Sequence, residues 1–77
     1  MIYVIYTYLT NGYPDTHIIR RSKGAATTLL RRGFKYYPEI LDKSKCLVRC
    51  IDVNRPAEYK DISAEDWLAK KGDYKNV

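Results

Sequence analysis

One histidine and two cysteines carry the most reactive side chains of this sequence, and their spacing does not predict an active site. His17 has no serine or cysteine beside it in a known nucleophile motif, and the carboxylates are not paired for general acid and base chemistry. Cys46 and Cys50 would lie about 13 Å apart on a strand, which is beyond disulfide range. They also lack the close spacing and the further ligands of a zinc site. We therefore expect no enzyme, no metal and no cofactor, and two cysteines that serve as small buried apolar side chains.

Basic side chains could instead bind a partner, and they are concentrated in one segment. Residues 16–38 contain six Lys or Arg and no Asp or Glu, while the whole chain has a net charge of +5. This segment therefore accounts for the entire excess of positive charge, and aromatic residues accompany it. The predicted partner-binding residues are Arg20, Arg21, Lys23, Arg31, Arg32, Lys35, Tyr36 and Tyr37.

Three interpretations of this segment stay open. Lys and Arg beside tyrosines can bind the phosphates of DNA or RNA while the rings stack on bases. The same side chains can attract and anchor a protein or nucleoprotein complex with an acidic surface. In the third interpretation the charges form a solvated helix face and the aromatic rings complete the core. The eight tyrosines of the chain favour a partner, because a small sheet cannot bury all of them and tyrosine is enriched at interfaces.

A hairpin is expected before the main helix. Residues 2–9 are almost all β-branched or aromatic and are apolar on both faces, which predicts a central strand. Residues 10–15 contain Asn-Gly and Pro-Asp, which favour a turn. Residues 16–21 have two interpretations: the second strand of the hairpin, or the start of one longer helix capped by Asp15. We favour the hairpin, because the two isoleucines of this segment prefer the extended state and a glycine would otherwise lie in a helix interior.

A helix is predicted over residues 23–32. Ser22 is its expected N-cap, and Gly33 is expected in the left-handed position just after its end. Pro38 disfavours helix at the residue before it. The predicted buried stripe of this helix consists of Ala25, Ala26, Leu29 and Leu30.

The second half of the chain predicts one more strand and one more helix. Residues 46–53 alternate as a strand, with Arg49 among apolar side chains on one face and the two cysteines on the other. Residues 63–72 form a short predicted helix that is capped by Ser63 and anchored by Trp67 and a leucine. The expected fold is α+β, with the element order β-β-α-β-α. It has a small three-stranded antiparallel sheet and helices on one face.

Length and composition predict a single compact domain over residues 1–77. A chain this short buries a limited core, so a homodimer or a bound partner would stabilise it. The sequence has no apolar run of about 18 residues, no signal-peptide pattern and only two cysteines. We expect a soluble, cytoplasmic protein with no membrane partner.

The chain resembles the small inhibitor proteins that phages and mobile elements encode, anti-CRISPR and other anti-defence proteins among them. The resemblance rests on the hairpin, on one helix entered by Arg-Arg-Ser-Lys-Gly-Ala-Ala at residues 20–26, on a third strand and on a tyrosine-rich surface. It implies a non-catalytic binding module in the host cytoplasm. Such a module would occlude a surface on a host defence protein or nucleoprotein complex. The alternative is a small basic module that binds DNA or RNA through phosphates.

Overall fold

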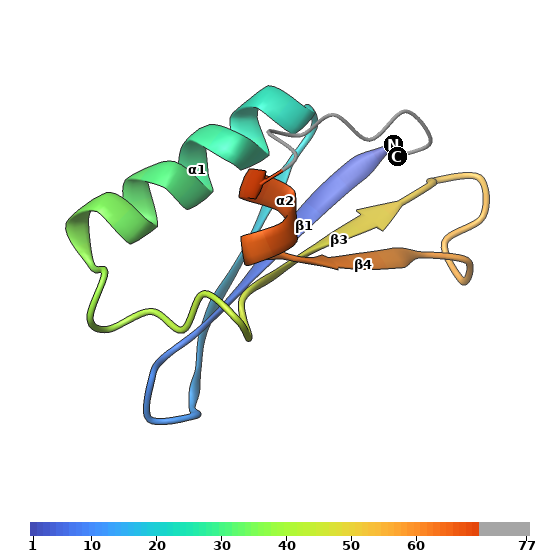
Figure 1. The fold of residues 1–77 in the computed structure, drawn as a ribbon. Coiled ribbons are helices and arrows are strands. Elements are labelled where there is room, and N and C mark those ends of the chain that lie inside the picture. Colours follow the sequence, from blue (N-terminus) through green and yellow to red (C-terminus); the bar gives the residue numbers. More distant parts are fainter. Residues whose placement is uncertain (70–77) are drawn as a thin grey trace.

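The computed structural model describes residues 1–69 as one antiparallel sheet covered by two helices (Figure 1). The strands follow the spatial order β2-β1-β3-β4, and each neighbouring pair is antiparallel. The α+β class is therefore confirmed. In chain order the elements are β1 (Ile2–Tyr8), β2 (Pro14–Arg20), α1 (Lys23–Tyr36), β3 (Leu47–Ile51), β4 (Lys60–Ser63) and α2 (Ala64–Ala69).

Strand β1 is central, as its two apolar faces predict. It pairs with β2 on one side and with β3 on the other, so that Tyr3 lies between Arg20 and Cys50. Tyr3 and Ile5 point into the core beneath the helices, and Val4 is buried on the opposite face. The hairpin interpretation of residues 16–21 is also confirmed, because β2 extends to Arg20 and the helix begins only at Lys23.

Helix α1 begins as predicted and ends four residues later than predicted. The Ser22 hydroxyl accepts a hydrogen bond from the N–H of Ala25 at 3.1 Å, which confirms the N-cap. The expectation that Gly33 ends the helix is wrong. The helix continues to Tyr36, and Tyr37, the residue before Pro38, is its C-cap. Gly33 instead allows a close approach, since a Cβ there would lie 3.2 Å from Leu41 Cδ1.

The sheet has a fourth strand that the sequence did not predict. Lys60–Ser63 pairs with β3, and Ile62 is its one buried side chain. The expectation of three strands is therefore wrong. A four-residue strand with one apolar residue shows no pattern of its own, and it forms because β3 offers it an edge to pair with. Strand β3 itself covers residues 47–51, within the predicted 46–53.

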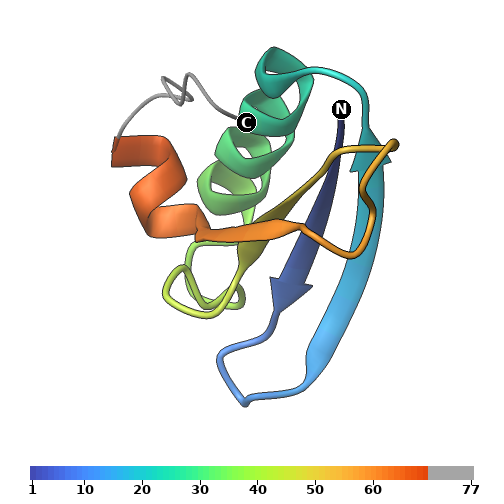
Figure 2. The same cartoon turned by 90° about the vertical axis from the view of Figure 1, so that its right-hand side faces the viewer.

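Both helices cover the same face of the sheet, as predicted (Figure 2). Trp67 of α2 is fully buried, its indole N–H donates to the Thr27 hydroxyl at 2.8 Å, and its ring lies 5.9 Å from that of Tyr3. Ser63 caps α2 by accepting from the N–H of Asp66. The helix is described over Ala64–Ala69, and the last three residues of the predicted 63–72 lie outside the described part of the chain.

Residues 37–46 connect α1 to β3 and fold back onto the end of β1. The N–H of Thr10 donates to the Ile40 carbonyl at 2.7 Å, and the N–H of Asp42 donates to the Tyr8 carbonyl at 2.8 Å. These bonds hold Leu41 in the core against α1. Across residues 1–69, neither helix has the length and apolar character needed to cross a membrane.

Candidate functional site

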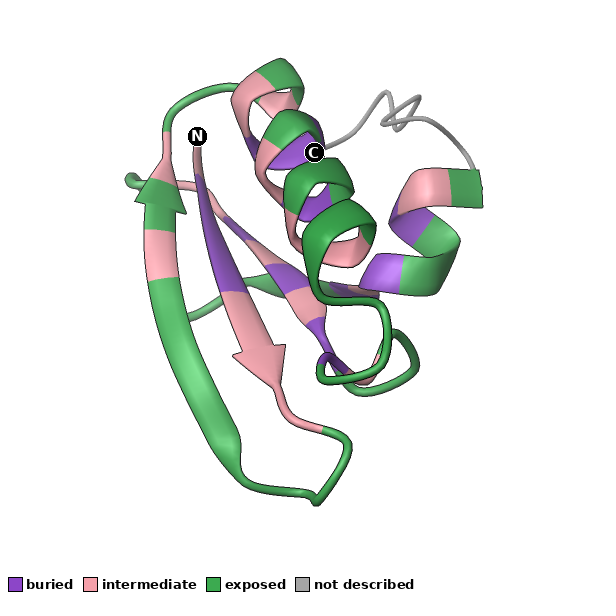
Figure 3. Cartoon of the chain, turned by 90° about the vertical axis from the view of Figure 1, so that its left-hand side faces the viewer, coloured by how far each residue is buried: buried purple, intermediate pink, exposed green. Residues whose placement is uncertain are grey.

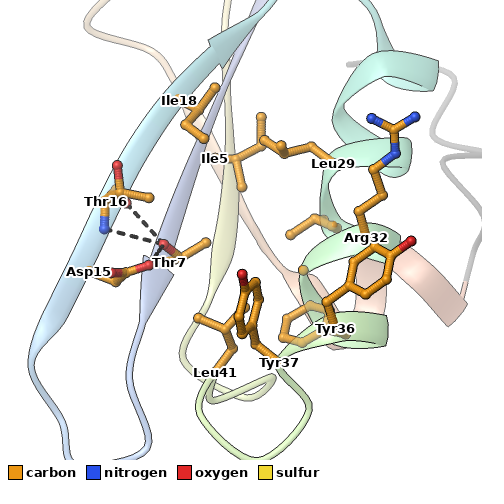
Figure 4. Close-up of a pocket in the computed structure, with 13 residues that line it drawn as sticks. Ile5, Thr7, Asp15, Thr16, Ile18, Leu29, Arg32, Tyr36, Tyr37 and Leu41 are labelled. Atoms are coloured by element: carbon orange, nitrogen blue, oxygen red, sulfur yellow. Dashed lines mark hydrogen bonds between the residues drawn. The ribbon is translucent and has the colours of Figure 1, made fainter.

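A largely apolar groove lies between α1 and the outer strand β2. The helix packs over the middle of the sheet, and most of β2 stays exposed (Figure 3). The groove has a volume of about 290 Å³. Its lining comprises Ile5, Thr7, Asp15, Thr16, Ile18, Leu29, Leu30, Arg32, Gly33, Phe34, Tyr36, Tyr37 and Leu41 (Figure 4).

Two regular periodicities build the groove. In β2 the side chains of Thr16 and Ile18 share the helix-facing side of the sheet, because they stand opposite Thr7 and Ile5 in the register. In α1 the side chains of Leu29, Arg32 and Tyr36 are spaced by three and four residues, so they share one flank of the helix. Ile18 and Leu29 therefore face each other across the groove (Figure 4).

One end of the groove is basic. Arg20 and Arg32 line a second hollow of about 240 Å³ together with Ala25, Thr28 and Leu29. Among the residues that the structure describes, no carboxylate lines this hollow. Within residues 1–69 neither arginine forms an ion pair, and the Arg20 guanidinium donates only to the Ile19 carbonyl, at 2.9 Å. Two guanidinium groups with no acidic neighbour in residues 1–69 favour the binding of an anionic group.

The opposite end of the groove is aromatic. Tyr36 and Tyr37 keep 65% and 56% of their surfaces exposed although both line the groove. Asp15 lies at this end, where its carboxylate accepts from the Thr7 hydroxyl at 3.1 Å (Figure 4). A third hollow of about 250 Å³ continues past Tyr37 to Ile40. The groove thus runs from two arginines to two exposed tyrosines.

The structure brings together half of the predicted partner-binding residues. Arg20, Arg32, Tyr36 and Tyr37 line the groove or the hollow at its basic end. Arg31 is exposed but lines neither, because one helical residue corresponds to a rotation of about 100° around the axis.

The remaining predicted residues also lie outside the groove. Lys35 is exposed, and its ammonium group lies 5.7 Å from the centre of the Tyr36 ring. Arg21 is exposed in the connection before α1, and Lys23 is half-buried in the first turn of the helix. The predicted basic surface is therefore split between one flank of α1, its outer side and its N-terminal end.

Sequence reasoning missed a second cluster on the face of the sheet that the helices leave uncovered. The Arg49 guanidinium lies 4.0 Å from the Tyr59 ring centre and 5.1 Å from that of Tyr6. It also donates to both carboxylate oxygens of Asp61, at 2.8 and 3.0 Å, and this pairing raises the pKa of Arg49. The one sign of this cluster in the sequence was the position of Arg49 among apolar residues on one face of a predicted strand. Two of its three partners, Asp61 and Tyr59, lie on or beside the unpredicted strand β4.

The reactive residues do not converge. His17 is exposed in β2, with its ring 6.0 Å from that of Tyr6. Cys46 and Cys50 are buried and free, as predicted, and burial raises the pKa of both thiols, that of Cys50 to about 11. Among the residues that the structure describes, no three His, Cys, Asp or Glu side chains gather as metal ligands would.

Comparisons with known proteins add no candidate relative. No family model, no curated protein and no solved structure matches the chain. The geometry of the groove is therefore the basis for a functional argument.

Proposed function

We propose that the protein is a non-catalytic binding module that recognises an acidic surface of a partner protein through the groove between α1 and β2. The observation that carries the proposal is the pair Arg20 and Arg32. They share one hollow, lined by no carboxylate from the described residues 1–69, beside a groove of apolar side chains. In the form that the resemblance suggests, the partner is a host defence protein or nucleoprotein complex, and the module acts as an inhibitor by covering one of its surfaces.

The chemistry of the groove resembles that of protein interfaces. Interface energy is concentrated in arginine and tyrosine side chains that surround or fill apolar pockets. Arg32 and Tyr36 flank the groove from one side of α1, and Leu29 and Ile18 supply apolar walls. A partner segment that places an acidic group between the two arginines could bury an apolar side chain in the same contact.

Charge reversal tests the proposal with a matched control. Arg20→Glu combined with Arg32→Glu changes the basic end of the groove, whereas Arg31→Glu combined with Lys35→Glu changes the net charge equally outside it. Immobilised protein captures partners from a nuclease-treated extract of the host cells, and each captured protein is then purified and titrated by calorimetry. We expect one purified partner to bind the wild type and the control pair, and to bind the groove pair at least ten-fold more weakly. Equal weakening by both pairs contradicts recognition through the groove.

The alternative of nucleic-acid binding draws on a different observation. Arg21, Arg31 and Lys35 are exposed outside the groove, so half of the predicted basic residues remain accessible to phosphates. Fluorescence anisotropy with random single- and double-stranded DNA and RNA, between about 50 and 200 mM salt, separates the two functions. Micromolar binding that weakens steeply with salt, and that the Arg31 and Lys35 pair abolishes, would establish the alternative. Absence of binding at low salt excludes this alternative and leaves the charges to a protein partner or to solvent alone.

A further inference from the structure

Strand β2 forms an edge of the sheet directly beside the groove. It is seven residues long and pairs only with β1 within the described chain. Natural edge strands are usually short or blocked, because their unpaired backbone groups attract other strands. In β2 the one proline, Pro14, is the first residue of the strand, and Ile19, near the other end of the strand, is 56% exposed. The middle of this edge is therefore open to pairing.

The register identifies the backbone groups that the edge presents. The N–H of Thr16 donates to the Thr7 hydroxyl of β1 at 3.2 Å, and the Thr16 carbonyl oxygen lies 3.3 Å from the same hydroxyl oxygen, so the backbone of Thr16 points toward β1 (Figure 4). Backbone groups alternate between the two sides of a strand. The N–H and C=O groups of His17 and Ile19 therefore point away from the sheet. The bond from the Arg20 guanidinium to the Ile19 carbonyl agrees with this direction.

A strand added at this edge would also reach the groove. Alternate side chains of such a strand lie on the helix-facing side of the sheet, beside Ile18 and opposite the flank of α1 that carries Leu29 and Arg32. An acidic side chain at one of these helix-facing positions, near the end of β2, would meet Arg20 and Arg32, whose hollow is lined by no carboxylate from residues 1–69. Charge complementarity therefore favours an acidic segment over a second copy of this chain, which has a net charge of +5.

We propose that the partner contributes an extended segment that pairs with the free edge of β2 as a fifth strand. Every second residue of this segment faces the helices: apolar residues at these positions enter the groove, and an acidic residue at the one beside the end of β2 meets Arg20 and Arg32. This inference rests on the proposed function and names the partner's chemistry and binding mode. Main-chain hydrogen bonds to His17 and Ile19 supply affinity, and the groove with its two arginines supplies selectivity, as in other cases of strand addition.

Backbone amide exchange tests the pairing directly. The probe is a seven-residue peptide with acetylated and amidated ends, with glutamate at positions 1 and 7, valine at positions 3 and 5, and threonine between them, so that the glutamates and valines share one face. It is added to labelled full-length protein at about one hundred times its Kd. We expect exchange of the His17 and Ile19 amides to slow by about 100-fold, since only the free protein exchanges there. The Thr16 and Ile18 amides point toward β1 and should change much less. Equal protection of all four amides, or of none, overturns strand addition.

Modified peptides separate backbone pairing from side-chain contact without changing the protein. One version of the probe carries N-methyl groups on its odd-numbered amides, and a second carries them on its even-numbered amides. A third version replaces every glutamate with lysine. One methylated peptide should lose binding while the other retains it, because only every second N–H group of the added strand points toward β2. The lysine peptide should bind at least ten-fold more weakly. Equal binding by both methylated peptides contradicts the proposal, as does failure of the glutamate peptide to bind at millimolar concentration.

Two variants of His17 test the backbone pairing independently of the peptide modifications. His17→Pro removes an outward N–H on an edge strand, a position where proline is tolerated, and His17→Ala retains that N–H. We expect His17→Pro to bind the glutamate peptide about five-fold more weakly than His17→Ala. Thermal melting of both variants establishes that they are folded.

The outcomes distinguish this inference from the proposed function. If Arg32→Glu weakens a purified partner while amide protection and peptide methylation have no effect, the groove binds an acidic protein without strand addition. If a partner protein is unaffected by Arg32→Glu and the peptide does not bind, both proposals fail. A concentration-dependent dimer in sedimentation that protects His17 and Ile19 without peptide would assign the edge to a second copy and overturn the inference.

Discussion

Replacement of Thr27 by valine tests the contact that joins the two helices. The Thr27 hydroxyl accepts from the Trp67 indole N–H at 2.8 Å and donates to the Lys23 carbonyl at 2.8 Å. Both side chains are buried, with 7% of Thr27 and none of Trp67 exposed. Thr27→Val keeps the β-branched shape, so the change removes both hydrogen bonds and little else.

The loss of stability expected for Thr27→Val follows from the burial of this hydrogen bond. Loss of a buried hydrogen-bond partner costs about 1–3 kcal/mol, and about 2 kcal/mol is a reasonable value for a contact with no water access. A domain of this size has a total stability of about 4–12 kcal/mol. The substitution should therefore lower the Tm by roughly 8 to 16 °C. Thr27→Ser keeps the hydroxyl and loses one methyl group, at a cost of about 1 kcal/mol.

The assay uses the one tryptophan of the chain as its own probe. Unfolding is monitored by the fluorescence of Trp67 in urea and by circular dichroism on heating. The proton resonance of its indole N–H reports the hydrogen bond in the folded protein. We expect this resonance to move in Thr27→Val and to stay in place in Thr27→Ser. A valine variant that is at least as stable as the serine variant, with an unchanged resonance, would refute the contact.

Three further predictions concern turns, helix propensity and ionisation. Gly12 has a φ of +93°, so Gly12→Ala should lower the free energy of unfolding by about 1–2 kcal/mol in urea titrations, and a neutral result would contradict the left-handed turn. A Cβ at Gly24 would meet no atom within 4 Å, so Gly24→Ala should raise the free energy of unfolding by up to about 1 kcal/mol and raise the Tm with it. A lower Tm would show that this turn of α1 is crowded. Burial raises the pKa of Cys50 from 9.0 to about 11. On raising the pH, the Cys50 thiol therefore loses its proton in the unfolded chain before it does so in the folded protein. The free energy of unfolding should decrease as pH rises from about 9 to 11. Urea titrations at several pH values should show a shallower decrease in Cys50→Ala, and an identical slope in both proteins would contradict the raised pKa.

The candidate site was predictable in its residue types and only partly in its location. The concentration of basic residues in 16–38 and the adjacent tyrosines identified Arg20, Arg32, Tyr36 and Tyr37. The apolar walls of the groove could not be inferred, because they depend on where α1 crosses the sheet. A leucine on the flank of a helix has the same sequence pattern whether it faces a strand or an open groove.

Elements with strong local sequence signals could be located before the fold was known. The apolar run of Ile2–Tyr8 made β1 central, Ser22 began α1 through its hydroxyl, and Pro38 prevented the helix from extending past Tyr37. Each of these depends on interactions within a few residues, so its cause is contained in the local sequence.

Features that depend on residues distant in the sequence form only when the chain packs. Strand β4 forms against β3, and Arg49 finds Asp61 and Tyr59 only after those strands pair. Likewise, Arg31 and Arg32 are equivalent in the sequence, yet only Arg32 lines the groove. The packing of α1 on the sheet fixes the rotation of the helix about its axis, and that rotation separates the two neighbouring charges.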